Sequence, residues 1–463
     1  MPAQPYDIAI VGAGSGGLTA ARFAAQLGAR VALIEKSRIG GDCTWTGCVP
    51  SKALLKAAKV AHNVRTASHY GVTTSAPVID MPAVREYVRA AIQQVYEFET
   101  PEALQQEGVE VIQGAARFLD HRTLSIGSRS IRSKTVLLTT GAHPVIPPIA
   151  GLSEVPYQTY EQIFDNDALP QTMIVVGGGP IGMELSQAYQ RLGAQVTVIA
   201  DRILPKEDPE VQAVMRRVLE REGVRFLWGR AMSARKGADG IIIQTDRDKA
   251  VGELLLVAAG RKPAVDGLDL ERAGVTYSEK GIPVDKKLRT NVKNIYAAGD
   301  VAGGYQFTHF AGWQAFQAVR NALLPGSSSG FTDLVPQVTF TDPEVAHVGQ
   351  VPDLPSGTKV WRWDMTRTDR AVCENDLDGF IKLVTTKNGT IVGATIVAAR
   401  AGEAISELII AIAKKMKVAD LAGVIHPYPT YSTAVQQLAA DITIHGLLAG
   451  TSGRIIRRLV NHA

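Results

Sequence analysis

A buried strand that runs straight into a glycine-rich turn and then into an apolar helix opens this chain, and it constrains the fold more than any other feature. The strand covers residues 6–11, the turn is Gly12-Ala13-Gly14-Ser15-Gly16-Gly17, and the helix ends near Leu27. The next strand, residues 31–34, ends at Glu35, where an acid can hold ribose hydroxyls. Such glycines let the backbone approach a pyrophosphate at a helix N-terminus. The pattern predicts a Rossmann-like unit that binds a dinucleotide.

The same pattern returns further along the chain. Residues 173–176 read as a strand, Gly177-Gly178-Gly179-Pro180-Ile181-Gly182 as the turn, and the following residues as a helix. Another strand, residues 195–199, then leads into Ala200-Asp201-Arg202. The chain is therefore predicted to hold two dinucleotide-binding units.

The end of this last strand bears on the choice of nicotinamide cofactor. Ala200 stands where the first unit has Glu35, so no acid repels a ribose 2′-phosphate there. Arg202 and Lys206 supply positive charge for such a phosphate, whereas Asp201 opposes it. The sequence favours NADPH slightly over NADH.

Cys43 and Cys48 form the second informative feature, because the chain has only one other cysteine, Cys373. That economy argues against a secreted disulfide framework and for a reducing compartment. In a regular helix, residues five apart lie roughly 8 Å from each other, so the segment must be irregular if the pair closes. Gly47 supplies backbone freedom, and Pro50 suits the first turn of a following helix. A helix N-terminus favours thiolates, so the pair is predicted to be a working dithiol.

Composition excludes several classes of protein. The 463 residues, 46% of them hydrophobic, are enough for two to four domains with real cores. The 49 basic and 45 acidic residues are interspersed, so we expect no nucleic-acid partner. No apolar stretch approaches a membrane span, and we expect a cytoplasmic protein without an integral membrane segment. The basic amphipathic run at 453–460 is interpreted as a solvated terminal helix, with a membrane surface or a partner as alternatives.

Further junctions between strands and loops complete the pattern. Residues 136–142 and 254–263 would each close one nucleotide-binding unit, and residues 294–300 end in Gly299-Asp300, where a carboxylate can accept hydrogen bonds from a polyol. Residues 307–311 open another helix, and a Gly/Ser-rich linker at 325–330 precedes a region of strands and apolar helices. The predicted fold class is α/β, with two Rossmann-like domains and a C-terminal α+β domain.

These motifs, in this order, resemble the class I flavin-dependent pyridine nucleotide-disulfide oxidoreductases, and most of all the members like mercuric reductase and dihydrolipoyl dehydrogenase. The resemblance includes Cys-x4-Cys-Val-Pro-Ser-Lys and covers essentially the whole chain. It implies a homodimer with the active site across the interface. It also implies an FAD-binding domain at 1–150 and 266–333, an NAD(P)H-binding domain at 151–265 and a dimerisation domain at 334–463.

The resemblance implies roles for single residues as well. Cys48 would be the thiolate against the flavin and Cys43 the thiol that faces the substrate, with Lys52 beside the flavin and Glu184 as its partner. No metal ligands are expected. The implied cofactor-binding residues are Gly12, Gly14, Ser15, Gly16, Gly17, Glu35, Lys36, Gly41, Lys52, Ala115, Thr140, Gly141, Gly177, Gly179, Gly182, Glu184, Ala200, Asp201, Arg202, Gly260, Arg261, Asp300, Thr308, His309 and Ala311.

The C-terminal motif departs from the family of disulfide reductases, which place a histidine and a glutamate there as acid-base catalyst and its orienter. Aligned on Pro429-Thr430, the histidine position is Tyr428 and the glutamate position is Thr433. Tyrosine, with a pKa near 10, is a poor base at neutral pH. His426 is a possible substitute, although on an extended segment it lies roughly 7 Å further along. Mercuric reductases have a tyrosine at this position, but their C-terminal cysteine pair has no counterpart here.

We therefore expect an FAD-dependent NAD(P)H oxidoreductase that passes electrons through Cys43 and Cys48 to an acceptor. The first hypothesis for the acceptor is a thiophilic metal ion or a small electrophile, as in a mercuric reductase. One alternative is a disulfide reductase of the dihydrolipoyl dehydrogenase, glutathione reductase or thioredoxin reductase type that lacks the usual dyad. The other alternative is a flavoprotein redox sensor with little turnover. Cys373 is interpreted as a cysteine without a ligand role.

Overall fold

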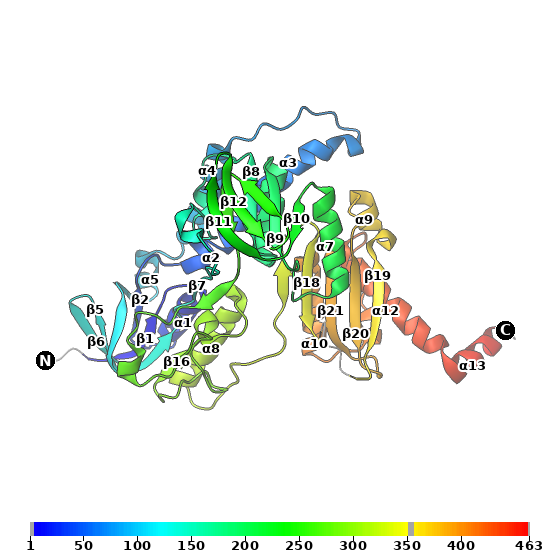
Figure 1. Cartoon of the computed structure of the whole chain (residues 1–463). Helices are drawn as coiled ribbons and strands as arrows, with labels where there is room; N and C mark the ends of the chain where they lie inside the picture. The colour runs from blue at the N-terminus through cyan, green and yellow to red at the C-terminus, as the bar shows by residue number, and fades with distance from the viewer. Residues whose placement is uncertain (1–3, 351–355, 462–463) are drawn as a thin grey trace. The chain divides into compact units, whose positions relative to one another are not determined.

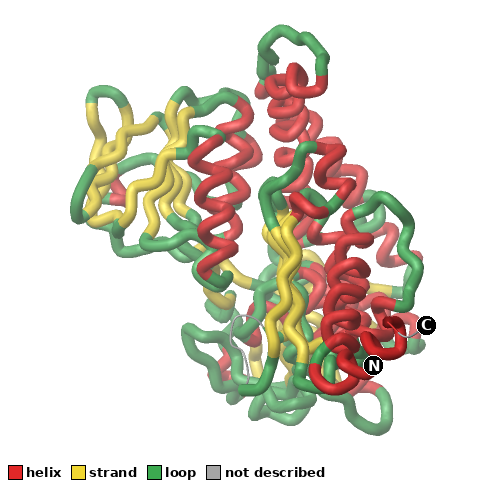
Figure 2. The backbone as a smooth tube through the Cα atoms, turned by 90° about the vertical axis from the view of Figure 1, so that its right-hand side faces the viewer, coloured by secondary structure: helices red, strands yellow, loops and turns green. Residues whose placement is uncertain are grey.

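A computed structural model describes residues 4–350 and 356–461, and the chain forms two compact units. Unit 1 comprises Met1–Asp201 and Gly223–Thr332, and unit 2 comprises Arg202–Glu222 and Asp333–Ala463. In both units helices lie beside strands (Figures 1 and 2), and the predicted α/β fold class is confirmed. Over the described residues, no helix is both long and apolar enough to cross a membrane.

The first Rossmann-like sheet of unit 1 has the strand order β3-β2-β1-β6-β5-β4, with β16 (Ile295–Ala297) paired to β6. β1 (Tyr6–Val11) lies between β2 (Val31–Glu35) and β6 (Arg129–Leu138) and runs parallel to both. β1 is almost wholly apolar and buried, as expected for a parallel strand covered on both faces. The remaining elements around this sheet are α1 (Ser15–Gln26), α4 (Met81–Tyr96), α5 (Pro101–Gln106), β3 (Val109–Gln113), β4 (Ala116–Asp120), β5 (Thr123–Ile126) and α8 (Thr308–Leu323).

A second parallel sheet in unit 1 has the order β10-β9-β8-β14. The strand β8 (Thr172–Val176) precedes α6 (Pro180–Leu192), and β9 (Gln195–Ala200) follows it. Both glycine-rich segments therefore connect a strand to a helix, as the sequence predicts. The other strands of this part are β10 (Arg225–Trp228), β14 (Leu254–Val257), the antiparallel set β11 (Ala231–Gly237), β12 (Gly240–Thr245) and β13 (Lys249–Gly252), and the pair β7 (Ala142–Pro144) and β15 (Arg261–Pro263).

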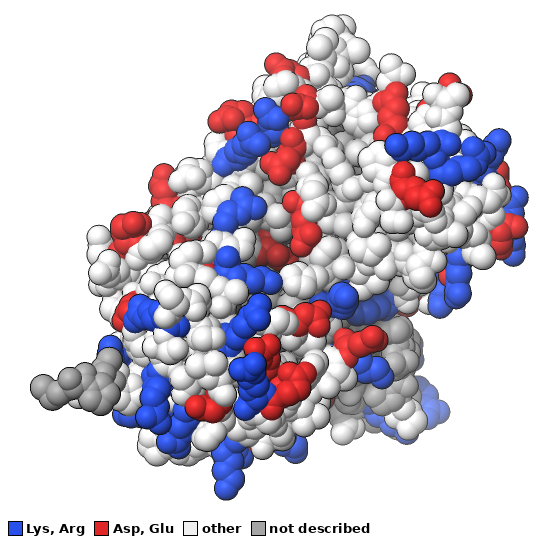
Figure 3. All heavy atoms as spheres, turned by 60° about the vertical axis from the view of Figure 1, so that its left-hand side comes forward, with Lys and Arg blue, Asp and Glu red and all other residues white. Residues whose placement is uncertain are grey.

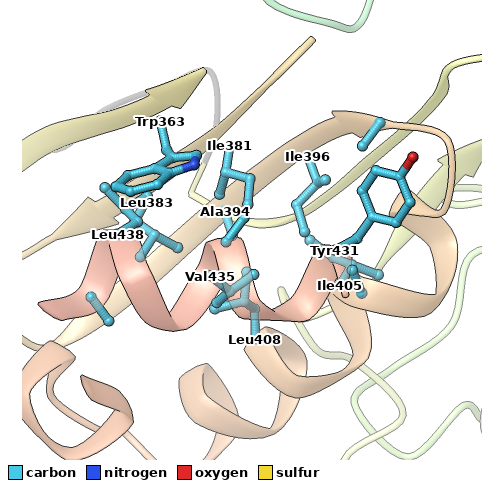
Figure 4. Close-up of a cluster of buried hydrophobic side chains, with 14 of the residues drawn as sticks. Trp363, Ile381, Leu383, Ala394, Ile396, Ile405, Leu408, Tyr431, Val435 and Leu438 are labelled. Carbon is cyan, nitrogen blue, oxygen red and sulfur yellow. The ribbon is translucent and has the colours of Figure 1, made fainter. Parts of the chain in front are cut away.

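Unit 2 is built on an antiparallel sheet with the order β17-β18-β21-β20-β19. One face of this sheet packs against α10 (Ala401–Ala413) and α12 (Tyr431–Leu448), and Figure 4 shows side chains of α12 meeting those of the strands. Val435 and Leu438 of α12 are buried in this core together with Ile381 of β20. The strands are β17 (Gln337–Thr339), β18 (Glu344–Gly349), β19 (Lys359–Asp364), β20 (Phe380–Thr385) and β21 (Ile391–Ala398), and the shorter helices are α9 (Asp369–Glu374) and α11 (Val418–Ala422).

One helix of unit 2 comes from an earlier part of the chain. The sequence analysis groups residues 202–222 with the second nucleotide-binding domain, but α7 (Pro209–Arg221) packs with the C-terminal residues. Lys382 Nζ lies 3.0 Å from Asp208 Oδ2, and His347 Nδ1 lies 2.9 Å from Glu207 Oε2. The sheet of unit 2 therefore binds the start of this helix through a largely buried ion pair and a buried hydrogen bond, contacts that no local pattern in the sequence reveals.

Charges of both signs are mixed on one face of the molecule. On the face drawn in Figure 3, Lys and Arg alternate with Asp and Glu among the described residues. A polyanion is attracted by an extended surface of one sign, and this face does not present one among those residues.

Candidate active site

The two cysteines lie on two consecutive helices of unit 1, a short one and a long one. Cys43 is in α2 (Gly41–Trp45), and α3 (Cys48–Thr66) begins at Cys48, so the irregular segment expected between them lies at Thr46 and Gly47. A Cβ atom at Gly47 would lie 2.7 Å from the carbonyl oxygen of Asp42. Glycine is therefore required by the close approach of the two helices. Both cysteines are free thiols, and Cys48 is the more exposed one.

The two thiols differ strongly in acidity. Cys48 Sγ lies 3.2 Å from Thr308 Oγ1 at the start of α8. A hydrogen bond from Cys43, a second from Thr308 and the charge of Lys52 together outweigh the partial desolvation of the thiolate and lower the pKa of Cys48 to about 6. The pKa of Cys43 is raised well above its ordinary value, because its proton is held by Cys48 and because it is buried. The negative charge therefore resides on Cys48 and the proton on Cys43.

This asymmetry predicts a pH profile. In the reduced, FAD-loaded enzyme, the rate at which iodoacetamide alkylates Cys48 is expected to rise with pH and to reach half its plateau at about pH 6, because the thiolate is the nucleophile. The variant Thr308→Val removes one stabilising hydrogen bond and is expected to move the midpoint upward. Peptide mass spectrometry resolves the alkylation of Cys48 from that of Cys43. A midpoint near the ordinary thiol pKa of 9.0 would contradict the assignment.

A salt bridge joins α3, which begins at Cys48, to α6 of the second Rossmann-like sheet, within unit 1. Lys52 Nζ on α3 lies 2.9 Å from Glu184 Oε2 on α6. The Glu184 side chain is only 9% exposed, whereas that of Lys52 is 37% exposed. A buried carboxylate is costly without a partner, and the ion pair with Lys52 offsets the cost of burying Glu184. Two residues that the resemblance pairs are thus adjacent in the structure.

The first glycine-rich turn fits a pyrophosphate. Gly12 has φ +100°, and a Cβ atom there would lie 2.5 Å from the carbonyl oxygen of Thr139. The start of α1 has no side-chain cap and no acid in its first turn, so its backbone N–H groups are available to an anion. Beside it, both carboxylate oxygens of Glu35 are fixed by backbone amides, Ala13 N at 2.8 Å and Ser37 N at 2.7 Å. These residues fit the diphosphate and a ribose of FAD.

The second glycine-rich turn, residues 177–182, also brings a helix close to a strand end, but the residues after the next strand, β9, differ from those of the first Rossmann-like sheet. A Cβ atom at Gly182 would lie 2.2 Å from the carbonyl oxygen of Gly177, so helix and turn approach as closely as in the first unit. After β9, Asp201 Oδ2 pairs with Arg230 Nε at 3.1 Å. Sequence analysis missed Arg230. The signal was available, because Arg230 follows β10, the parallel neighbour of β9, and parallel strands end at the same edge of a sheet.

A second network of charges surrounds the carboxylate predicted to hold the polyol. Arg261 Nη2 lies 3.0 Å from Asp300 Oδ2 and 2.8 Å from Asp42 Oδ2, and Arg261 Nε donates to the hydroxyl of Tyr160 at 3.3 Å. Burial and the charge of Asp42 raise the pKa of Asp300, although Arg261 opposes this. The sequence analysis named Arg261 and Asp300 but missed Asp42 and Tyr160. Asp42 immediately precedes Cys43, so one guanidinium contacts both the cysteine helix and the carboxylate that is predicted to bind a polyol.

Other predicted cofactor residues lie where strands of unit 1 end. Ala115 follows β3, Thr140 and Gly141 follow β6, and Gly260 follows β14. Ligands of parallel α/β sheets bind at this edge. The predicted residues Thr308, His309 and Ala311 form the first turn of α8, and Lys36 and Gly41 follow β2.

In unit 2, Tyr428 is exposed and its hydroxyl donates a hydrogen bond to Asp369 Oδ2 at 2.6 Å. This bond and the negative charge of Asp369 raise the pKa of Tyr428. Cys373 is exposed one helical turn after Asp369 on α9. The phenol proton of Tyr428 is therefore directed to the carboxylate of Asp369. The sequence analysis did not identify Asp369.

His426, the possible substitute for the catalytic histidine, and Thr433, at the position of the glutamate, both have other partners. Both ring nitrogens of His426 are engaged, Nε2 with Glu407 Oε2 at 2.7 Å and Nδ1 with the carbonyl oxygen of Val424 at 3.0 Å. Thr433 takes part in the N-terminal capping box of α12 with Thr430. In these hydrogen bonds neither His426 nor Thr433 contacts Tyr428. Over the described part of the chain, no group of three or more His, Cys, Asp or Glu residues is arranged to hold a metal ion.

The fold has two Rossmann-like sheets, and the site combines the thiol of Cys43 with the thiolate of Cys48 near Lys52. Together they define an α/β oxidoreductase that uses dinucleotides. The chain belongs to the pyridine nucleotide-disulphide oxidoreductases, whose family model matches residues 6–315. The model of the family's dimerisation domain matches residues 335–439 and supports a homodimer. Members of this family are NAD(P)H-dependent flavoproteins that bind FAD.

Relatives with two different activities match almost the whole chain. The mercuric reductase of Acidithiobacillus ferrooxidans is 35% identical over 462 residues, which covers 95% of this chain and 83% of the relative. The dihydrolipoyl dehydrogenase of Thermus scotoductus is 32% identical over 453 residues, which covers 94% and 97%. Among solved structures, the HOCl-induced flavoprotein disulfide reductase RclA of Escherichia coli has a TM-score of 0.85 at 26% identity and covers 94% of this chain and 99% of its own. LpdA of Mycobacterium tuberculosis has a TM-score of 0.86 at 29% identity, with coverages of 94% and 99%.

Proposed function

We propose that this enzyme transfers electrons from NADPH, through FAD and the Cys43–Cys48 pair, to a thiophilic metal ion or a small electrophile. The observation that carries the proposal is the environment of Tyr428, which stands where disulfide reductases of the family have a histidine. Its hydroxyl proton is directed to Asp369, and its pKa is raised. Reduction of a disulfide needs an acid for the leaving thiolate, whereas reduction of a thiol-bound metal ion does not.

The residues of unit 1 have complementary tasks in this proposal. When bound, FAD would supply a hydride acceptor for the nicotinamide and an electron-pair donor for the Cys43–Cys48 disulfide, whose sulfur–sulfur bond breaks to leave one thiolate and one thiol. Cys48 holds the resulting negative charge, because Thr308 and Lys52 stabilise its thiolate. Cys43 keeps the proton and offers a thiol to the acceptor. Lys52 is kept in position by Glu184.

The remaining parts of the proposal concern the cofactor and the assembly. NADPH is preferred over NADH, because the Asp201 carboxylate is neutralised by Arg230 while Arg202 stays exposed. The active site lies across the interface of a homodimer, so Tyr428 serves the thiols of the partner subunit. A cytoplasmic location follows from the need for reduced thiols.

The names of relatives support a metal acceptor. Several similar proteins are mercuric reductases, and one solved structure of RclA is a Cu(II) complex. Dihydrolipoyl dehydrogenases of similar identity support the second candidate, a disulfide reductase. Anaerobic oxidation of NADPH with Hg(II) or Cu(II) thiol complexes, lipoamide, glutathione disulfide and thioredoxin separates the two. Brisk turnover of a disulfide that Cys43→Ser abolishes would overturn the metal proposal. Failure of NADPH and NADH to reduce the flavin within seconds would favour a redox sensor.

The role of Tyr428 makes a specific prediction. In the proposed dimer the Tyr428 oxygen contacts and positions the acceptor, so Tyr428→Phe is expected to lower metal turnover about 10- to 100-fold, while the rate of flavin reduction stays unchanged. Stopped-flow spectroscopy and steady-state assays measure the two rates. Tyr277→Phe is a matched control, because Tyr277 also donates its hydroxyl to a carboxylate, that of Glu271, but lies in unit 1. Equal turnover by Tyr428→Phe and the wild type would remove this tyrosine from the mechanism.

A further inference from the structure

The chain continues beyond the part that matches the family's dimerisation domain. That match ends at residue 439, within α12, which runs from the core of unit 2 to Leu448. The last helix, α13 (Gly450–Asn461), follows at once. Figure 1 shows both helices, in red, leading away from the sheet of unit 2. We call residues 444–461 the C-terminal arm.

Large apolar side chains of the C-terminal arm face solvent. On α12, Ile444 is 54% exposed and Leu447 is 56% exposed. On α13, Leu459 is 68% exposed and Val460 is 70% exposed. Over the described residues, α12 is the one element against which α13 packs to any marked degree. Several large apolar side chains exposed on neighbouring helices indicate a binding surface, because their exposure to water is unfavourable.

The sequence of α13 separates its two faces. Ile455 and Leu459 are four positions apart, as are Ile456 and Val460, so all four project from one side of the helix. The other side carries Arg454, Arg457 and Arg458. Residues 442–461 contain no Asp or Glu and no Phe, Trp or Tyr. A basic face opposite an apolar face also occurs in membrane-surface helices, but these commonly carry Trp or Phe on the apolar face. The lack of aromatic residues, together with the continuity of the arm with α12, favours a protein surface as the partner.

We propose that the C-terminal arm docks by its apolar face on a second copy of this chain and extends the dimer contact beyond the dimerisation domain. The arm is the direct continuation of α12, whose first turns are buried in the core of that domain. It therefore continues directly from the domain that the family's dimerisation model matches. In a twofold dimer each arm contact occurs twice, so a short apolar face has a doubled effect on assembly.

The test compares the two faces of α13 in the full-length, FAD-loaded protein. The double variant Leu459→Asp, Val460→Asp places charges on the apolar face, and Arg458→Gln is the control on the basic face. Sedimentation velocity over a dilution series measures the dissociation constant of the dimer. We expect at least about a 30-fold increase for the double variant and less than about a 3-fold change for the control. Circular dichroism and flavin absorbance verify that both variants are folded.

A second variant and a lipid assay keep the proposal falsifiable. Truncation after Ala449 removes α13 and is expected to weaken the dimer in the same direction. The wild type is expected to stay in the supernatant when phosphatidylglycerol vesicles are sedimented. Unchanged dimer dissociation in both the double and the truncated variant would overturn the proposal. Vesicle binding that the double variant loses, with the dimer unchanged, would also overturn it and would identify an anionic lipid surface as the partner.

Discussion

Replacing Cys43 with serine is expected to lower turnover of the acceptor at least ~10³-fold, the scale of loss seen when a nucleophile is removed. Cys48→Ser is expected to have a similar effect on turnover and also to abolish the group that titrates at about pH 6. Reduction of the flavin by NADPH should persist in both variants, because neither thiol takes part in binding the nicotinamide. Anaerobic stopped-flow measurements of flavin bleaching, combined with steady-state assays, separate the two steps.

Cys373→Ser serves as the control, since Cys373 is the remaining cysteine and lies in unit 2. Turnover by this variant should equal that of the wild type. If Cys43→Ser retained most of the wild-type turnover, electrons would reach the acceptor by a route that avoids the thiol pair, and the proposed mechanism would be wrong.

Adding one methyl group at either glycine-rich turn is expected to have the second largest effect. A Cβ atom at Gly17 would lie 1.9 Å from the carbonyl oxygen of Gly12, and no side-chain rotation can relieve a clash with backbone. Gly17→Ala should therefore destabilise the fold by about 3 kcal/mol or more and release FAD. Gly182→Ala should retain FAD but slow flavin reduction by NADPH at least ~100-fold, because the same clash occurs with Gly177 at 2.2 Å. Flavin content, thermal unfolding and stopped-flow kinetics test the three effects.

Gly446→Ala is the matched control for these substitutions. Gly446 lies inside α12, and a Cβ atom there would meet nothing within 4 Å. Alanine is the better helix former, so this variant should be as stable as the wild type or more stable by about 0.5–1 kcal/mol. Full flavin content and normal reduction in Gly17→Ala would contradict the reason given for the glycine.

The two Rossmann-like folds could be predicted because their sequence patterns are local. A buried strand, a glycine turn and an apolar helix each depend on neighbouring residues, so the predicted strand at 6–11 coincides with β1 and the predicted one at 195–199 differs from β9 by one residue. The interruption of the helix between Cys43 and Cys48 was predicted from their spacing of five residues and from Gly47 between them. Sequence spacing was sufficient in each of these cases.

Contacts between distant residues were not predictable in the same way. Arg261 and Asp42 are 219 positions apart, and Tyr428 and Asp369 are 59 positions apart. A single sequence contains no signal that pairs such charges, because many acids lie at similar separations from each base. The same reason applies to α7, whose amphipathic pattern predicts that one face is covered but not which sheet covers it.

The packing of α7 has a consequence for the modularity of the chain. The linker near residue 330 looks like a boundary at which a gene fragment encoding the C-terminal sheet could be separated or exchanged. A fragment cut there would lack α7, and His347, only 7% exposed, and Lys382, 15% exposed, would lose their acidic partners, Glu207 and Asp208. Recombination between relatives therefore has to exchange residues 202–222 together with the C-terminal sheet. Residues 202–222 and the C-terminal sheet are far apart in sequence but form one structural unit.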